Sequence, residues 1–263
     1  MAIRLIMQKT HVKSLVISGA SSGLGMALAR HYLERGAIVA AFVRRGNLLQ
    51  DLAAEFPDQV LCYTLDVRDS EAVQQAASDL IARIGSPDVV IANAGVSTGT
   101  LTEHSEDIDV FQEVMDINVM GMVKTFQPFI TAMRTARAGT VVGIASVAGF
   151  RGLPGASAYS ASKAAVISYL ESLRVELRDS GVRVVTICPG YIKTPMTAAN
   201  PYPMPFILDA GEAAKRMAHA IERQTSFTVI PWQMGLIGLA LNLLPPWLYD
   251  RLFVNAPRKP RVK

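Results

Sequence analysis

The sequence predicts an α/β protein, a single domain in which helices cover both faces of a parallel sheet. Short runs of apolar and β-branched residues alternate with helical segments along the 263 residues, and most of these runs contain no polar residue. Uninterrupted apolar runs are typical of strands buried on both faces. Repeated strand–helix alternation with short connections indicates a doubly wound, Rossmann-type sheet. One domain over residues 1–263 is expected, because no linker and no repeat of fixed period interrupts the pattern.

The individual elements follow from the hydrophobic pattern and from residues that end helices. Seven runs are expected to be strands: 15–18, 38–43, 60–64, 89–92, 140–144, 183–188 and 227–230. Five segments are expected to be helices: 26–35, 47–55, 70–84, 110–134 and 158–180. Gly36, Gly85 and Gly181 directly follow three of these segments and are natural helix ends. Residues 200–206 carry three prolines and are expected to form an irregular loop.

The charge distribution argues against nucleic acid as a partner. The 26 basic and 22 acidic residues leave a formal net charge of +4. Residues 250–263 contain five basic residues and one acidic residue, so this tail holds the whole excess and residues 1–249 are neutral as a group. A nucleic-acid-binding protein needs basic residues gathered on one surface. With half of its residues apolar, the chain is also too hydrophobic to be disordered.

We expect no disulfide, no metal site and no secretion signal. Cys62 and Cys188 lie far apart in apolar runs, which is typical of buried thiols in a reducing compartment. Residues 1–13 lack the uninterrupted apolar core of a signal peptide, so a cytoplasmic location is expected. The four histidines show no ligand spacing: His11, His31, His104 and His219.

The first expected strand runs into a glycine-rich turn, SGASSGLG, over residues 18–25. Gly19, Gly23 and Gly25 allow a tight turn and a close approach of the backbone to a pyrophosphate. The helix that follows offers unpaired N–H groups and the positive end of its dipole to the same anion. A glycine cluster alone is also compatible with an ordinary strand–helix turn. Its position after the first buried strand favours dinucleotide binding.

A second group of residues has the spacing needed for acid–base chemistry. Tyr159 and Lys163 are four residues apart in an expected helix, so both side chains project from one face. A protonated lysine beside a phenol favours the phenolate, and we expect it to lower the pKa of Tyr159 from about 10. The phenol then exchanges a proton with a carbonyl or alcohol oxygen. Ser146, which follows an expected strand, is placed to hydrogen-bond that oxygen.

Together these motifs resemble those of the short-chain dehydrogenase/reductase family. The nucleotide loop of that family reads Thr-Gly-x-x-x-Gly-x-Gly, and this chain differs only in Ser18, which keeps the hydroxyl. The resemblance covers about residues 13–194. The remaining motifs occur in the family's order: Asn93-Ala94-Gly95, Asn118, Ser146, Tyr159 with Lys163, and Pro189-Gly190.

The resemblance implies a role for each catalytic residue. Tyr159 is implied as the acid/base, and Lys163 as its electrostatic partner and the anchor of the cofactor ribose. Ser146 is implied as the group that stabilises the substrate oxygen. Asn118 is implied to hold a water that links the lysine to solvent.

The resemblance also implies which residues contact a nicotinamide dinucleotide. Asp66 and Val67 are expected at the adenine, Asn93 to Gly95 beneath the ribose, and Ile192 and Thr194 at the carboxamide. The complete set expected to bind the cofactor is Gly19, Ser21, Ser22, Gly23, Leu24, Gly25, Arg44, Arg45, Asp66, Val67, Asn93, Ala94, Gly95, Tyr159, Lys163, Pro189, Gly190, Ile192 and Thr194.

The end of the second expected strand predicts NADP(H) over NAD(H). NAD-preferring members of the family have an acidic residue here, which takes the ribose hydroxyls. This chain has Arg44 at that place, followed by Arg45. Two guanidinium groups suit a dianionic 2′-phosphate, which a carboxylate would repel. The alternative is that both are ordinary exposed loop arginines.

Two segments bear on the substrate and on surface contacts. In this family the region after the sixth strand determines specificity, here about residues 195–210, which carry Met196, Tyr202, Met204 and Phe206 and no charge before Asp209. Such a loop favours an apolar or lipid-like carbonyl compound, unless these side chains only pack the loop onto the body.

Residues 231–253 are strongly apolar and precede the basic tail. They suit either peripheral membrane contact or packing against the substrate loop or another subunit.

The sequence therefore predicts an NADP(H)-dependent oxidoreductase that interconverts a ketone or aldehyde and an alcohol. Two alternatives remain at this point: a catalytically silent NADP(H)-binding sensor, and a nucleotide-sugar epimerase or dehydratase. A sensor normally lacks the Tyr159 and Lys163 pair, and an epimerase usually carries a larger sugar-binding lobe than this chain has room for. By resemblance a homodimer or homotetramer is expected.

Overall fold

The computed structural model describes residues 12–261. Residues 1–11, which belong to the segment expected not to be a signal peptide, lie outside the described residues. The same holds for Lys263 at the end of the basic tail.

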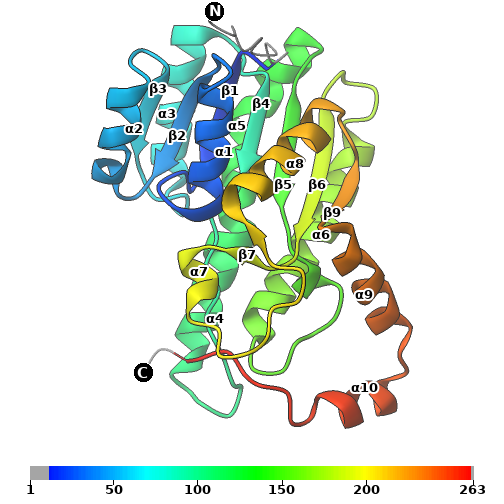
Figure 1. The fold of residues 1–263 in the computed structure, drawn as a ribbon. Helices are drawn as coiled ribbons and strands as arrows, with labels where there is room; N and C mark the ends of the chain where they lie inside the picture. Colours follow the sequence, from blue (N-terminus) through cyan, green and yellow to red (C-terminus); the bar gives the residue numbers. More distant parts are fainter. Residues whose placement is uncertain (1–11, 262–263) are drawn as a thin grey trace, which may run out of the picture.

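Seven parallel strands form one sheet in the order β3-β2-β1-β4-β5-β6-β9, which confirms the doubly wound architecture (Figure 1). The strand order reverses between β1 and β4, which pair through Leu15–Val89 to Ser18–Ala92. The strands are β1 (Ser14–Ser18), β2 (Ile38–Val43), β3 (Val60–Thr64), β4 (Val89–Ala92), β5 (Thr140–Ile144), β6 (Arg183–Pro189) and β9 (Phe227–Ile230).

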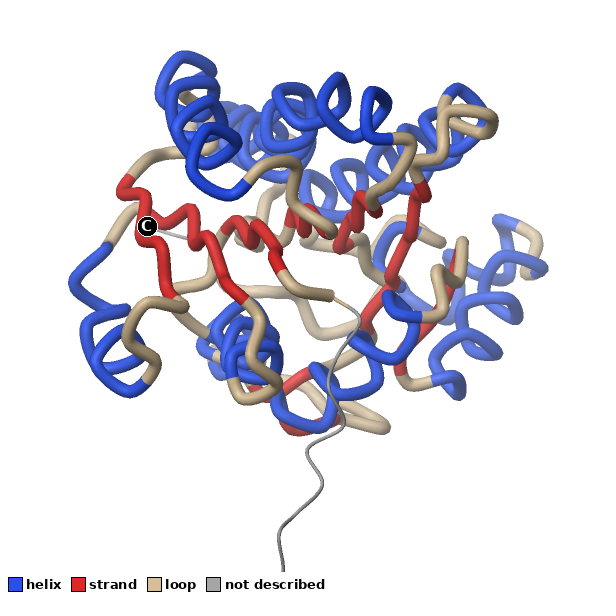
Figure 2. The backbone as a smooth tube through the Cα atoms, turned by 90° about the horizontal axis from the view of Figure 1, so that it is seen from above, coloured by secondary structure: helices blue, strands red, loops and turns tan. Residues whose placement is uncertain are grey.

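Helices cover both faces of this sheet (Figure 2). Alternate residues of the central strands supply the two cores. Leu15 and Ile17 of β1 point into one core, and Val16 between them points into the other. The first face is covered by α1 (Gly23–Leu33), α2 (Gln50–Glu55) and α8 (Ala210–Glu222). The second face is covered by α3 (Ser70–Ile84), α5 (Gly121–Ala136) and α6 (Ser157–Glu176).

The expected long helix over 110–134 is continuous but not uniform. It begins earlier as α4 (Asp107–Met115), passes through a π-helical turn at Asp116–Met120, and continues as α5. A π turn inserts one extra residue into the helical ladder and often marks a functional position. Here it contains Asn118. Two short 3₁₀ turns complete this part of the fold: η1 (Gly46–Leu49) and η3 (Val147–Gly149).

The remaining elements lie beyond the carboxyl end of the sheet. The strands β7 (Ile192–Lys193) and β8 (Leu208–Asp209) pair with each other and enclose α7 (Pro195–Ala198). Residues 200–206 contain neither helix nor strand, as expected. The chain ends in α9 (Trp232–Leu243) and α10 (Pro246–Phe253). No helix within residues 12–261 is long and apolar enough to span a bilayer.

The prediction that both cysteines are buried is wrong for Cys62. Cys188 in β6 is buried, but Cys62 in β3 is exposed. The reason is that β3 is the edge strand, whose faces the helices cover less completely: none of its residues is buried, whereas all residues of β4 and β5 are. Alternate side chains of β3 face solvent or are only partly covered.

Candidate active site

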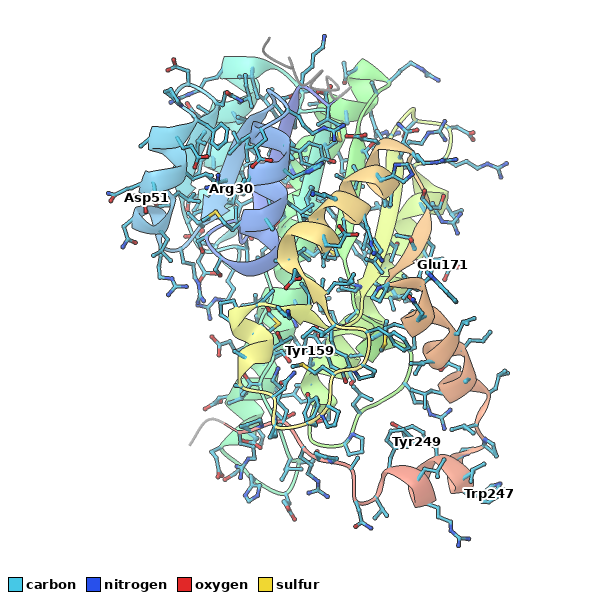
Figure 3. The ribbon with its side chains drawn as sticks, viewed as in Figure 1. Arg30, Asp51, Tyr159, Glu171, Trp247 and Tyr249 are labelled. Atoms are coloured by element: carbon cyan, nitrogen blue, oxygen red, sulfur yellow. The ribbon has the colours of Figure 1, made fainter. Side chains whose placement is uncertain are left out.

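Several neighbouring strands open at their carboxyl ends onto one cavity of about 330 Å³. It lies where β1 and β4 adjoin, the position at which doubly wound sheets bind ligands. Tyr159 lies at this end of the sheet (Figure 3). Of the predicted site residues, all but Asn118 line the cavity: Gly19, Ser21, Ser22, Gly23, Leu24, Gly25, Arg44, Arg45, Asp66, Val67, Asn93, Ala94, Gly95, Ser146, Tyr159, Lys163, Pro189, Gly190, Ile192 and Thr194.

The loop between β1 and α1 is shaped by its glycines. Gly19 and Gly23 adopt positive φ angles of 72° and 56°, a conformation that favours glycine. A Cβ atom on Gly25 would collide with the carbonyl oxygen of Gly19 and would lie 2.6 Å from Asn93 Nδ2. Ser22 caps α1 without a side-chain hydrogen bond, so no side chain competes there for the N–H groups of the first turn. These features fit a dinucleotide pyrophosphate held at a helix N-terminus.

Ser18, which stands where the family motif has threonine, ties the glycine loop to the end of β4. Its hydroxyl oxygen accepts hydrogen bonds from the backbone N–H groups of Asn93 at 3.1 Å and Ala94 at 3.2 Å. Asn93 Nδ2 donates in return to the carbonyl oxygens of Ser18 at 3.1 Å and Gly19 at 3.2 Å. The Asn93-Ala94-Gly95 motif therefore fixes the glycine loop, which lines the cavity.

Two guanidinium groups stand at the end of β2. Arg44 and Arg45 are exposed, line the cavity and form no ion pair with another residue in the described range 12–261. Asp66 is engaged differently, because Arg68 donates to its carboxylate through Nε at 3.1 Å and Nη2 at 2.7 Å. Hydrogen bonds from Arg68, and less strongly the charge of Arg44, hold the pKa of Asp66 below its usual range.

The acid–base residues converge from β5 and α6. Tyr159 and Lys163 lie on successive turns at the start of α6, and Lys163 is only 5% exposed. Lys163 Nζ lies 5.8 Å from the centre of the Tyr159 ring and donates a hydrogen bond to the Ile144 carbonyl oxygen at 2.8 Å. Ser146 follows β5, and its hydroxyl oxygen accepts the N–H of Ala148 at 3.1 Å, which fixes its orientation.

The ionisation of this pair differs from the sequence-based expectation. Burial raises the pKa of Tyr159, and a hydrogen bond with Ser146 offsets this only in part. Burial lowers the pKa of Lys163 to about 8. The prediction that Lys163 draws the pKa of Tyr159 downward is therefore wrong for this structure, because the lysine is engaged by Ile144 and the phenol is desolvated. Tyr159 is held as a neutral phenol, the form that donates a proton.

Asn118 is fully buried, and its side chain is already bonded within the protein. Its Oδ1 accepts the N–H of Val96 at 2.8 Å, and its Nδ2 donates to the Val96 carbonyl at 3.0 Å and to Ser162 Oγ at 2.9 Å. Ser162 Oγ in turn donates to the Tyr159 carbonyl oxygen at 2.8 Å. The side chain thus links the end of the β4 loop to the turn that carries Tyr159. The water that Asn118 is expected to hold between Lys163 and solvent stays a prediction. Because the Asn118 side chain is already bonded, such a water would have to bind its main-chain atoms.

The segment after β6 packs onto the glycine loop. Ile192 is buried, and Thr194 caps the start of α7. A Cβ atom on Gly23 would lie 3.3 Å from Thr194 Cγ2. The residues expected at the nicotinamide carboxamide are therefore held against the loop expected at the pyrophosphate.

Comparison with known proteins assigns this arrangement to a family. The family model described as short chain dehydrogenase matches residues 13–203. The chain belongs to the short-chain dehydrogenase family. This dehydrogenase is 38% identical over 247 residues to an uncharacterized oxidoreductase of Myxococcus xanthus, covering 93% of this chain and 97% of that protein. It is 37% identical over 190 residues to 2-(R)-hydroxypropyl-CoM dehydrogenase of Xanthobacter autotrophicus, covering 69% of this chain and 75% of that one.

Solved structures agree with the assignment. A short chain dehydrogenase of Burkholderia cenocepacia in complex with NADP has a TM-score of 0.80 and 28% identity, covering 92% of this dehydrogenase and 97% of that chain. An alcohol dehydrogenase of Thermococcus sibiricus complexed with 5-hydroxy-NADP has a TM-score of 0.73 and 26% identity, covering 82% and 95%. The dehydrogenase is thus an oxidoreductase that acts on alcohols or carbonyls with a nicotinamide cofactor.

The structure places one residue near the site that the sequence did not indicate, Lys259. The basic tail returns to the dehydrogenase site, where Lys259 Nζ lies 6.0 Å from the centre of the Tyr159 ring. Pro257 and Pro260 beside it indicate a non-helical segment, but no sequence pattern shows where such a segment docks. In the substrate loop, which was expected from the sequence, the Tyr202 ring contacts that of Tyr191 at 6.4 Å between centres, and burial raises the pKa of Tyr202.

The buried ammonium of Lys163 predicts a pH-dependent cost in stability. Its pKa of about 8 in the folded dehydrogenase is below the usual lysine value, so the unfolded chain binds more protons between these two values. Stability contributed by this group therefore rises as pH increases through that window. We expect the stability of Lys163→Met relative to wild type, measured by thermal unfolding, to be higher at pH 7 than at a pH about two units higher.

A matched control is Lys215→Met, which removes an exposed lysine from α8. Its melting temperature relative to wild type should change little over the same range. If the relative melting temperature of Lys163→Met does not change with pH either, the Lys163 ammonium is not desolvated, which contradicts the structure.

Proposed function

We propose that the protein reduces a ketone or aldehyde, or oxidises the corresponding alcohol, with NADP(H), and that its substrate is apolar or lipid-like. The reaction is supported by the convergence of Tyr159, Lys163 and Ser146 on a cavity that also carries the glycine loop. The cofactor preference is supported by Arg44 and Arg45 in the same cavity.

Each polar side chain has a distinct task in the reductive direction. NADPH, when bound, supplies the hydride. Ser146 donates a hydrogen bond to the substrate carbonyl oxygen and stabilises the charge that develops on it. Tyr159 is protonated at neutral pH because burial raises its pKa, and it gives its proton to that oxygen. Lys163, still mostly charged at neutral pH, stabilises the phenolate that remains.

The substrate loop supports an apolar substrate body. Met196 lines the cavity and is 40% exposed, and the Tyr202 ring lies against that of Tyr191, with 6.4 Å between the ring centres. A screen of NADPH consumption against aliphatic ketones of increasing chain length tests the proposal. We expect kcat/KM to rise with chain length, since each buried methylene contributes about 0.8 kcal/mol. A flat response contradicts an apolar pocket, and no consumption with any ketone or aldehyde contradicts the reaction itself.

The two arginines predict a measurable cofactor preference. Arg44→Asp is expected to raise the Kd for NADPH roughly tenfold, because a carboxylate replaces a partner of the 2′-phosphate in a position screened by solvent. The affinity for NADH should stay the same or improve. Fluorescence titration of both cofactors measures the change.

The control for this variant is Arg183→Asp, an exposed arginine at the opposite, amino end of β6. It should leave both affinities unchanged. Equal affinities of the wild-type protein for NADPH and NADH would remove the role given to Arg44.

The outer side of α9 and α10 is the proposed contact surface with a membrane or a second subunit. Met234 and Gly238 of α9 pack onto the body, against Gly190 and Phe150, while the large apolar side chains on the other side are exposed (Figure 3 labels Trp247). These are Trp232, Leu236, Leu239, Leu243, Trp247 and Leu252. Either contact fits a cytoplasmic protein that forms a homodimer or homotetramer. Liposome flotation of the full chain against a truncation before Trp232 tests the membrane contact, and no difference between the two would contradict it.

A further inference from the structure

The chain returns to the active site after its last helix. Residues 255–261, the tail segment, run from α10 below the carboxyl end of the sheet toward α4 (Figure 1). The backbone N–H of Gly99 donates to the Pro260 carbonyl oxygen at 3.0 Å. A Cβ atom on Gly99 would collide with the Lys259 carbonyl oxygen, and one on Gly155 would lie 2.7 Å from Arg258 Cβ. These two glycines let the tail segment pack closely against the loops around the site.

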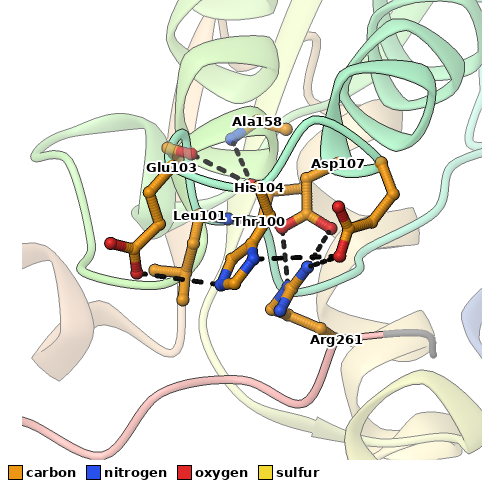
Figure 4. Close-up of polar contacts among 9 residues, drawn as sticks. Thr100, Leu101, Glu103, His104, Asp107, Ala158 and Arg261 are labelled. Carbon is orange, nitrogen blue, oxygen red and sulfur yellow. Dashed lines mark hydrogen bonds and ion pairs between the residues drawn. The ribbon is translucent and has the colours of Figure 1, made fainter.

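Arg261 fastens the tail segment at its far end. Its Nε donates to Asp107 Oδ2 at 2.7 Å, and its Nη2 donates to Asp107 Oδ1 and Glu106 Oε1, both at 3.0 Å (Figure 4). Asp107 is 4% exposed and also accepts the N–H of Leu101 at 2.7 Å. Two-point arginine–carboxylate pairs have a fixed geometry and are among the stronger polar contacts. The tail segment is therefore held in place without any contribution from Lys259.

Lys259 lies between these anchors and faces Tyr159. Its Nζ is 6.0 Å from the centre of the Tyr159 ring and donates to Ser97 Oγ at 2.7 Å. Within the part of the chain that the structure describes, no carboxylate pairs with it. Burial lowers the pKa of Lys259, which reflects a partly desolvated ammonium with a neutral hydroxyl as its hydrogen-bond partner. An ammonium has three N–H donors, so Ser97 leaves two of them available.

The two ammonium groups near Tyr159 have different surroundings. Lys163 donates to the Ile144 carbonyl and belongs to the acid–base pair. Lys259 comes from the tail segment and donates to Ser97 Oγ instead of a main-chain carbonyl. A partly buried charge without a counter-ion is unfavourable, and an anionic ligand removes that cost.

We propose that Lys259, with Ser97, binds a carboxylate carried by the substrate. The inference rests on the proposed carbonyl chemistry at Tyr159 and specifies its substrate class, an oxo acid or hydroxy acid with an apolar body. Because Lys259 Nζ lies 6.0 Å from the centre of the Tyr159 ring, whose hydroxyl donates the proton, a carboxylate bound by Lys259 is near the reacting carbon. The apolar body then extends toward the substrate loop. The loop composition alone disfavours charged substrates, and Lys259 reverses that expectation for an acid placed at this point.

Benzoylformate and its methyl ester are suitable probes, because they share the same ketone and apolar body and differ in the carboxylate. We expect the wild-type protein with NADPH to prefer the acid. Lys259→Gln should raise KM for benzoylformate about tenfold or more, with little change in kcat and little change for the ester. Arg258→Gln, which removes a neighbouring exposed charge, should leave the preference intact.

Calorimetric titration of benzoylformate into the NADPH complex gives a second readout that does not depend on turnover. Binding that is lost in Lys259→Gln supports the inference even if neither compound is reduced, in which case the proposed reaction fails alone. Equal losses for acid and ester would make Lys259 a structural contact. Faster turnover of both compounds by Lys259→Gln would mean that Lys259 hinders access to the site instead of binding the substrate. Either result overturns the inference.

Discussion

Tyr159→Phe is expected to lower kcat for carbonyl reduction by roughly 100- to 10,000-fold while NADPH binding stays nearly unchanged. The substitution removes the phenolic hydroxyl with its ionisable proton and keeps the aromatic ring. Lys163 is held by the Ile144 carbonyl and not by the phenol oxygen, so its position should not change. Steady-state turnover and a fluorescence titration with NADPH measure the two effects separately.

The control for this variant is Tyr63→Phe in β3. This variant also removes a phenolic hydroxyl that donates a hydrogen bond, here to Asp79 Oδ2 at 2.6 Å, but Tyr63 lies outside the cavity. It should lose some stability and keep its kcat. If Tyr159→Phe retains a tenth of the wild-type kcat or more, Tyr159 is not the proton donor and the proposed reaction at this site is wrong.

The architecture was predictable because burial on both faces leaves a local mark on the sequence. Strands β2, β3, β4, β5 and β9 match the expected runs residue for residue, and β1 and β6 differ by one residue at one end. The run that forms β3 resembles the others in composition, yet it lies at the sheet edge, which is why Cys62 is exposed. Which strand is outermost depends on the order of strands in space, and that order is not a local property.

The site residues were predictable where their positions follow from short spacing. Tyr159 and Lys163 share a helix face, and the glycine turn follows a buried strand, so local sequence is enough to infer both. Their ionisation could not be inferred in this way. The pKa directions depend on the Ile144 carbonyl and on burial by distant elements.

Contacts over long sequence separations were equally hidden. Asn118 is placed in a π turn, and its side chain is bonded by Val96 and Ser162, 22 and 44 residues away. Lys259 reaches Ser97 across 162 residues. The sequence shows that the tail is basic, but it does not show where the tail packs. Such placements follow only from the packing of the completed fold.

Gly25→Ala is expected to weaken NADPH binding roughly 10- to 100-fold, because overpacking a tight site costs about 1–3 kcal/mol. The added methyl group would collide with the Gly19 carbonyl oxygen and crowd Asn93 Nδ2 at 2.6 Å. Neither group can move freely, since Asn93 is bonded to Ser18 and Gly19. The glycine loop must therefore shift, and the pyrophosphate contacts shift with it.

Gly211→Ala in α8 separates this effect from a general response to adding a methyl group. A Cβ atom on Gly211 meets nothing within 4 Å, and alanine favours a helix over glycine, so this variant should keep its NADPH affinity and gain slightly in stability. Thermal unfolding of Gly25→Ala, measured first, shows whether the variant is folded before affinity is compared. A folded Gly25→Ala that binds NADPH as tightly as wild type would mean that the pyrophosphate is not held by this loop. The cofactor would then have to be anchored mainly by Arg44, Arg45 and Lys163, and the Kd of Arg44→Asp should be affected far more strongly than tenfold.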